Sequence, residues 1–325
     1  MIKNSKFVGI DVAKKDFYAC FEENMESRKF NNTVAGINSF ARYLNKNNFS
    51  KRQTIIGLES TGSYHLRLCL QCGELGFKVK VINPLIIKKY NQTNLRRVKN
   101  DKKDASLIRY CVTQGAGYEF TENEETLVLK SLVRQRNSLA NSMLKVKRQQ
   151  EDVKYKEDCL KVKIGSVYDE IQDLLREKAK ELEKQLRGFR KEEQKLLQSI
   201  PGVGPITAIS FIAEIVDIKR FKEAKKLVAY IGLDSRVHQS GTSVKGKGYI
   251  SKRGNKILRT RLYNAASVAV LHPNLFREFF QKKRSEGKPY KVALVATMNK
   301  MTHVIHSVWT SSKPFEDRRS NQKED

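Results

Sequence analysis

The sequence predicts an α/β domain in residues 1–120, an α-helical coiled coil in 121–198 and a mainly α-helical domain in 199–325. In the first part, short apolar runs alternate with helix-length amphipathic segments, which is the pattern of a sheet covered by helices. In the second, proline is absent and apolar residues recur every three or four positions. In the third, a glycine-rich turn leads into an apolar helix. A chain of 325 residues has room for this organisation.

Acidic residues follow the expected strands of the N-terminal domain. The strands are expected at residues 6–12, 16–21, 28–31, 54–58 and 78–82, with helices from about 34 to 44 and 60 to 72. Asp11 lies near the end of the first strand and Glu59 directly follows the fourth. Asp101 and Asp104 open a later helix, and their spacing of three puts both carboxylates on one face. Because ligands collect outside the carboxyl ends of strands in α/β sheets, the four acids can converge on one point.

Two explanations of these acids stay open from the residues alone. Neighbouring carboxylates repel one another unless a divalent cation lies between them, and oxygen-only ligands suit Mg²⁺ or Mn²⁺. The other explanation is structural. Asp101 followed by Asp104 is a helix-capping arrangement, and Asp11 can pair with Lys14 or Lys15.

Composition indicates a polyanionic partner. Sixty-three Lys and Arg against 35 Asp and Glu give a net charge of +28, which favours DNA or RNA over a membrane surface. The N-terminus carries no signal-peptide pattern. The apolar stretch 292–309 is interrupted by Asn, Lys and His, so we expect a buried helix there and not a membrane span. Five cysteines without framework spacing favour a reducing cytoplasm.

One cysteine pattern resembles a metal site. His65, Cys69 and Cys72 follow helical spacing, so their side chains can point the same way. Zinc needs a fourth protein ligand or an open catalytic position, and leucines surround the three residues on the helix. We therefore interpret the cysteines as small buried apolar residues.

Residues 121–198 predict two long amphipathic helices that break or bend near Gly165. The steps of three and four suit a coiled-coil seam and a dimerisation arm, because so thin an element has little core of its own. A hairpin that packs only on itself is the alternative. The seam consists of Leu129, Leu132, Leu139, Met143, Val146, Ile171, Leu174, Leu182, Leu186 and Phe189.

The third part begins with the turn 199–205, Ser-Ile-Pro-Gly-Val-Gly-Pro, before an apolar helix at 206–215. This turn resembles a helix-hairpin-helix, in which backbone N–H groups approach phosphates. A plain structural turn explains the residues equally well, but the positive charge of the chain favours phosphate contact.

A basic, glycine- and serine-rich loop follows at 236–255, and no acid occurs from Ser235 to Arg277. We expect a basic helix from Lys256 to Leu271. On residue chemistry alone the loop would clamp phosphates, because a serine hydroxyl is a poor nucleophile until something activates it. The residues expected to contact nucleic acid are Arg236, Lys245, Lys247, Lys252, Arg253, Lys256 and Arg259.

Five segments carry a resemblance to a known family. Residues 10–14 (IDVAK), 58–62 (LESTG) and 100–105 (NDKKDA) resemble the three acidic blocks of the DEDD insertion-sequence recombinases, the insertion-sequence one-ten family that includes Piv-type invertases. Residues 239–246 (QSGTSVKG) and 250–255 (ISKRGN) resemble that family's C-terminal transposase signature. The segments occur in the family's order and span nearly all of the chain.

The resemblance implies a fold and an active site. The N-terminal domain would have the RuvC-like ribonuclease-H fold, followed by a coiled coil and a transposase domain. Asp11, Glu59, Asp101 and Asp104 would hold Mg²⁺ or Mn²⁺. The family's nucleophilic serine directly precedes a glycine and is therefore Ser240 here, with Ser243 as the competing candidate.

The resemblance also implies partners. The family's members are transposases and recombinases that use a covalent phosphoserine intermediate and a bridge RNA, which guides the enzyme to target and donor DNA. Their active sites combine the RuvC-like domain of one subunit with the transposase domain of another, so a homodimer or homotetramer is expected. Two alternatives remain: a RuvC-like metal-dependent junction nuclease, and a non-catalytic protein that bridges nucleic acids.

Overall fold

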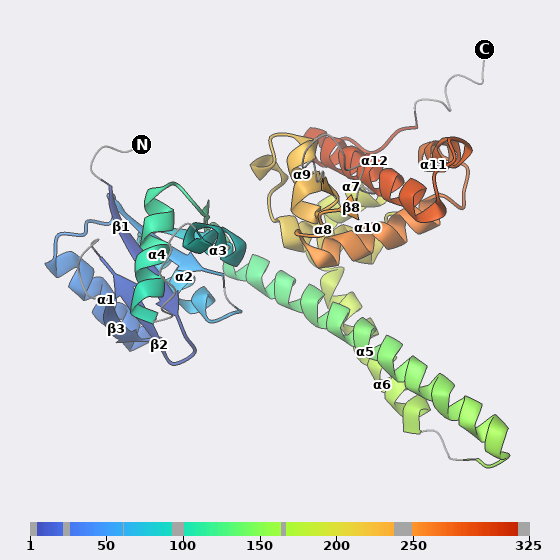
Figure 1. The fold of residues 1–325 in the computed structure, drawn as a ribbon, viewed down its shortest axis with the longest axis horizontal. Helices are drawn as coiled ribbons and strands as arrows, with labels where there is room; N and C mark the ends of the chain where they lie inside the picture. Colours follow the sequence, from blue (N-terminus) through green and yellow to red (C-terminus); the bar gives the residue numbers. More distant parts are fainter. Residues whose placement is uncertain are drawn as a thin grey trace. The chain divides into compact units, whose positions relative to one another are not determined.

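The computed structural model describes residues 5–21, 27–60, 62–92, 101–163, 167–236 and 249–317; the side chains of 91–92, 101–103, 235–236 and 249 lie outside the description. The chain folds into two compact units, Met1–Asn123 and Glu124–Asp325 (Figure 1). The second unit contains both the predicted coiled coil and the predicted C-terminal domain. The division into three domains remains a prediction.

A mixed sheet forms the centre of the first unit, which confirms the α/β prediction. Its strands have the order β3-β2-β1-β4-β5-β6. The three central strands β1, β4 and β5 are parallel, and β2, β3 and β6 are antiparallel to their neighbours. The strands are β1 (Lys6–Val12), β2 (Asp16–Cys20), β3 (Arg28–Asn31), β4 (Thr54–Glu59), β5 (Lys78–Ile82) and β6 (Tyr118–Glu119). The short strand β6 was not expected from the sequence.

Helices cover both faces of this sheet. On one face, α1 (Val34–Lys46) and α2 (His65–Glu74) pack on β1 and β4 through a cluster that includes Ile10, Phe40 and Leu68. On the other face, α3 (Pro84–Gln92) and α4 (Asp101–Thr113) form a second cluster. The helix α3 was not predicted, although proline favours the first position of a helix.

The second unit begins with a helical arm. Its helices α5 (Glu124–Leu160) and α6 (Val167–Leu186) run side by side (Figure 1) and are joined by the ion pair Arg136–Glu183 at 2.6 Å. Gly165, the expected break, lies outside the described residues. The run also ends earlier than predicted, because Arg190 adopts a left-handed conformation (φ 43°) before a separate helix, α7 (Lys191–Gln198). A coiled coil between the arms of two copies remains a prediction.

The rest of the second unit is mainly helical, as predicted. The turn after α7 leads to α8 (Pro205–Ile215), and the stretch predicted to be buried forms α12 (Tyr290–Ser311). None of the helices in the described ranges has both the length and the apolar character that a membrane span needs. The other elements are η1 (Ile218–Arg220), α9 (Ala224–Ile231), β7 (Ser235–Arg236), β8 (Tyr249–Ile250), α10 (Lys256–Ala269) and α11 (Leu275–Ser285).

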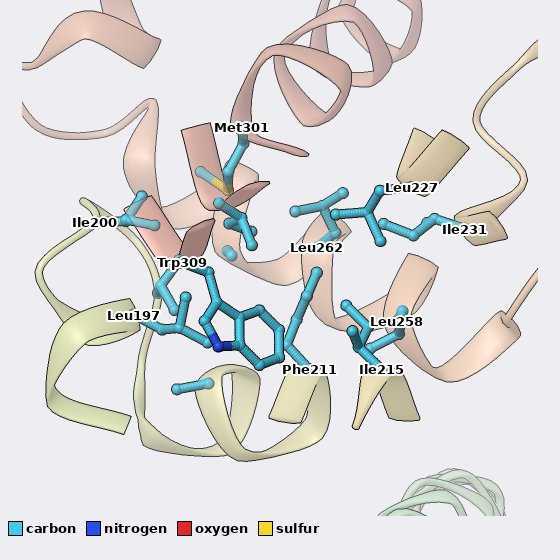
Figure 2. Close-up of a cluster of buried hydrophobic side chains, with 14 of the residues drawn as sticks. Leu197, Ile200, Phe211, Ile215, Leu227, Ile231, Leu258, Leu262, Met301 and Trp309 are labelled. Carbon is cyan, nitrogen blue, oxygen red and sulfur yellow. The ribbon is translucent and has the colours of Figure 1, made fainter. Parts of the chain in front are cut away.

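One apolar core holds these helices and the root of the arm together. Figure 2 shows side chains of α7 to α10 and α12 gathered around Phe211 and Trp309. Leu129 and Val133 of α5 and Leu186 of α6 belong to the same cluster and are 2% exposed. The arm is therefore fixed at its root by core packing.

Candidate active site

Two glycines let helix α4 lie directly on the sheet. A Cβ atom at Gly9 of β1 would be 2.2 Å from both the Ala105 oxygen and the Arg109 nitrogen. A Cβ atom at Gly57 of β4 would be 2.0 Å from a methyl group of Val112. A side chain larger than hydrogen at Gly9 would displace the helix backbone, and one at Gly57 would displace the Val112 side chain.

Helix α4 runs antiparallel to β1. The Ala105 oxygen and the Arg109 backbone nitrogen both lie over Gly9, and the Arg109 side chain reaches from there toward the start of the strand. Its Nε donates a hydrogen bond to the Phe7 oxygen at 3.2 Å and to the Phe21 oxygen at 3.1 Å. The first turn of α4 therefore lies toward the carboxyl end of β1, where Asp11 is located.

The register of the sheet places Asp11 and Glu59 in neighbouring positions. The last residue pair between β1 and β4 is Ile10 with Leu58, and each acid is one residue further along its strand. Because side chains alternate along a strand, both acids are on the face that carries Gly9 and Gly57, the face covered by α4.

Asp104 directly precedes Ala105 in the first turn of α4. Asp11, Glu59 and Asp104 thus share one face and one edge of the sheet, and each side chain is half-buried. Asp101 opens the same helix, but its side chain is not among those described. Within the described residues, no three Asp, Glu, His or Cys side chains stand close enough together to hold a metal ion. The fold brings the acids to one region without forming a ligand set among the described side chains.

The donor chemistry of these residues fits a hard divalent cation. All four candidates are carboxylates, and two of them end neighbouring parallel strands, where α/β folds place ligands. The first turn of α4 adds one described carboxylate, Asp104.

Gly9, Gly57 and Arg109 belong to the framework of this site and were missed by the sequence reading. Each glycine stands two residues before an acid, in the patterns Gly9-Ile10-Asp11 and Gly57-Leu58-Glu59. A glycine inside an apolar strand signals close approach by another backbone, so this spacing could have identified the docking surface of α4.

The basic loop of the second unit is held together at its base. Strands β7 and β8 pair Ser235 with Ile250 and Arg236 with Tyr249. The Ser251 hydroxyl donates to the Asp234 carboxylate, and the Ser251 backbone N–H donates to the Asp234 oxygen at 2.8 Å. These bonds join residues 234–236, before the segment 237–248, to residues 249–251 after it.

Four of the expected nucleic-acid contacts have described side chains. Lys252, Arg253 and Lys256 are exposed at the start of α10. Arg259 is half-buried instead and donates to the Ile231 oxygen at 2.9 Å. Its guanidinium therefore ties α10 to the end of α9.

The remaining expected residues fall outside what the structure describes. Ser240, Ser243, Lys245 and Lys247 are in the undescribed segment 237–248, and the side chain of Arg236 is also not described.

The turn after α7 packs against α10. Gly202 has φ +85°, and a Cβ atom there would be 2.3 Å from the Ala265 oxygen. Gly204, the residue before α8, has open space around its Cα. The turn thus has one glycine required by packing and one at an open helix start, where backbone N–H groups can face an anion.

The cysteines of α2 are buried in the first unit. Burial raises the pKa of the Cys69 thiol, and it raises that of Cys72 to about 12. Both thiols therefore stay protonated near neutral pH in the metal-free protein.

Comparisons with known proteins match both units. Residues 194–281 match the model described as "Transposase IS116/IS110/IS902 family", and residues 8–153 match the DEDD transposase model of IS110 elements. The pilin gene-inverting protein of Moraxella bovis is 27% identical over 323 residues, which cover 96% of this chain and 98% of the relative. The transposase for insertion sequence element IS1111A of Coxiella burnetii is 26% identical over 357 aligned positions, which cover 97% of this chain and 92% of the relative.

Proposed function

The chain belongs to the IS116/IS110/IS902 family of transposases, and from this premise we propose that it is a DNA recombinase that moves an insertion sequence by a phosphoserine mechanism. The observation that carries the proposal is the convergence of Asp11, Glu59 and the first turn of α4 on one edge of the sheet. The match at 194–281 includes Ser240 and its basic surroundings.

Ser240 provides the nucleophile in this proposal. Its Oγ attacks a backbone phosphorus, the Oγ–P bond forms, the P–O3′ bond breaks and a 3′-hydroxyl leaves with a proton. The phosphodiester energy is kept in the serine ester, so strands can be exchanged without hydrolysis. Lys252, Arg253 and Lys256 neutralise the phosphates on either side.

The acids form the second half of the site. Mg²⁺ or Mn²⁺ held by Asp11, Glu59, Asp101 and Asp104 would stabilise the negative charge that develops on the phosphate. The RuvC-like ribonuclease-H fold is supported by the mixed sheet with three parallel central strands. The first turn of α4 supplies Asp101 and Asp104 as a pair.

We further propose that a bridge RNA guides the enzyme to target and donor DNA. A net charge of +28 supports this, since one RNA and two duplexes need many phosphate contacts and few base contacts. A homodimer or homotetramer is supported by the arm, where Leu144 (56%), Leu174 (55%) and Val167 (68%) are exposed.

Trapping of the adduct tests the proposal. The protein is incubated with target DNA, donor DNA and the RNA encoded beside its gene, and protein–DNA adducts are separated under denaturing conditions. Wild type and Ser243→Ala should form an adduct and recombinant product, and Ser240→Ala should form neither. Strand cleavage that survives Ser240→Ala without any adduct would instead identify a junction nuclease.

A further inference from the structure

We infer that Asn32 is a positioning residue that clamps together the two chain segments following Asp11 and Glu59. The inference rests on the proposed metal site and adds to it a residue that is not an acid. Asn32 follows β3, and its side chain is among the few polar ones buried in the first unit, with 4% exposed.

One amide nitrogen makes the clamp. The Asn32 Nδ2 donates to the Ala13 oxygen at 3.1 Å and to the Tyr64 oxygen at 3.1 Å. Ala13 is two residues after Asp11, and Tyr64 is in the segment between Glu59 and α2. Both hydrogens of the amide are used, so a single side chain joins the two acid-bearing segments.

The clamp acts where the pairing between β1 and β4 ends. The last pair of the β1–β4 ladder is Ile10 with Leu58, so Asp11 and Glu59 stand just beyond it. Past this row the parallel pairing of the two strands is not continued. Beyond this row, the bonds from Asn32 to Ala13 and Tyr64 join the two segments.

Asn32 is itself held from two sides. Its backbone N–H donates to the Lys15 oxygen at 2.9 Å, and its backbone oxygen accepts from the Arg67 guanidinium at 2.6 Å. These bonds fix Asn32 to the β1–β2 turn and to α2. A side chain anchored in this way can transmit the position of one segment to the other.

The other polar atom of the Asn32 side chain is the amide oxygen, Oδ1. Within the described residues, Asn32 Oδ1 is buried without a hydrogen-bond partner. It shares a carbon with the clamping Nδ2, so it lies at the same junction. Buried acceptors are normally satisfied, by ordered water where protein donors are lacking.

Mn²⁺ binding tests the role of Asn32 in the full-length protein. Free Mn²⁺ is measured by electron paramagnetic resonance during titration of wild type, Asn32→Ala, Asn32→Asp and Asp11→Asn, and circular dichroism confirms folding. Asn32→Asp keeps the size of the side chain but replaces the donor by an acceptor. Both Asn32 variants should bind Mn²⁺ on the order of 10- to 100-fold more weakly than wild type, the usual effect of losing a residue that supports metal ligands.

Gln71→Ala is the matched control. The Gln71 side chain joins α2 to α1, with Nε2 bonds to the Val34 oxygen at 3.1 Å and to Asn38 Oδ1 at 2.9 Å, and it makes no described bond to the segments that carry the acids. Its Mn²⁺ affinity should equal that of wild type. Equal losses in Gln71→Ala and Asn32→Ala would overturn the positioning role, as would wild-type affinity in both Asn32 variants.

Asp11→Asn separates failure of the clamp from failure of the metal site. If Asp11→Asn abolishes Mn²⁺ binding while the Asn32 variants bind normally, the site stands and the clamp is wrong. If wild type binds no Mn²⁺, or Asp11→Asn binds as wild type does, the proposed metal site and the role of Asn32 both fail.

Discussion

Arg134 and Glu214 form a two-point ion pair at the root of the arm, with Nε–Oε1 and Nη2–Oε2 distances of 3.0 and 3.2 Å. Glu214 is in the otherwise apolar helix α8, where only 3% of it is exposed. Its Oε2 also accepts from the Asn255 Nδ2 at 2.8 Å, and Asn255 caps α10. One buried carboxylate therefore connects the arm to the residue that ends the basic loop.

Arg134→Ala should destabilise the second unit. The change leaves a buried carboxylate with Asn255 as its remaining described side-chain partner. We expect a loss of about 1–2 kcal/mol in the free energy of unfolding, reduced from the full cost because 59% of the Arg134 side chain is exposed. Urea unfolding followed by circular dichroism measures it. Lys178→Ala removes the Lys178–Glu181 ion pair, in which both side chains are exposed, and should have a much smaller effect on the free energy of unfolding. Equal costs would show that burial of Glu214 is unimportant.

Gly9→Ala should displace α4 and with it the acid-bearing turn. The new methyl group meets backbone atoms at 2.2 Å, and overpacking of this kind costs about 1–3 kcal/mol. We expect a lower melting temperature and loss of recombination. Gly73→Ala in α2 is the control, because nothing lies within 4 Å of its added Cβ. It should leave both properties unchanged or raise stability slightly. A Gly9→Ala protein with normal recombination would contradict the close docking of α4.

The elements that could be predicted from the sequence are those in which apolar residues recur at regular spacing. The strands β1 to β5 and the helices α8, α10 and α12 have clear apolar patterns and were located to within a few residues. The helix α3 was missed because it is short and directly follows a strand ending at Asn83-Pro84, where the pattern suggested a stop. The break at Arg190 was missed because nothing in the residue type signals a left-handed conformation there.

The candidate site was only partly accessible from the sequence. The acids were found because acids in apolar strands are conspicuous. Asn32 and Glu214 were not, since their roles depend on partners 19 to 80 positions away along the chain. Such long-range hydrogen bonds leave no periodic pattern.

Removal of divalent metal should stop strand chemistry without unfolding the protein. We expect that chelation abolishes adduct formation and that added Mg²⁺ or Mn²⁺ restores it, because the acids need a cation to act on a phosphate. Asp104→Asn should reduce adduct formation at least 100-fold with little effect on the melting temperature, an order of magnitude typical for loss of one electrostatic contact in catalysis. If adducts form equally well in excess chelator, the acids are structural caps.

Leu174→Lys should weaken self-association. Leu174 is on the predicted coiled-coil seam of α6 yet is 55% exposed in the single chain. A lysine there would place a charge in an apolar interface between copies. Sedimentation velocity should show a shift toward monomer. Glu177→Lys, on the exposed surface of the same helix, introduces the same side chain with a larger change in charge and should leave the assembly unchanged. Identical behaviour of the two variants would indicate that the arm packs only on itself.

The five thiols should differ sharply in reactivity. All five are free, and Cys159 of α5 is exposed whereas Cys20, Cys69, Cys72 and Cys111 are buried. Ellman's reagent at pH 8 should therefore modify one thiol rapidly in the native protein and four more only after denaturation. The Cys159→Ser variant should lack the rapid phase. If a rapidly modified thiol remains in that variant, it belongs to the first unit and shows that this unit opens readily in solution.

High pH should lower the stability of the first unit through its buried thiols. Burial raises the pKa of Cys72 to about 12 and that of Cys111 to about 11, above the value of about 8.5 for an exposed thiol. Because the unfolded chain then loses these protons first, their contribution to stability is complete below about pH 8.5 and declines as the pH rises toward 11 or 12. Urea unfolding of the first unit at pH 8 and pH 10 should therefore give a lower free energy at pH 10. Cys72→Ala should make the difference in free energy between pH 8 and pH 10 smaller. An unchanged difference would show that Cys72 is not buried in the core.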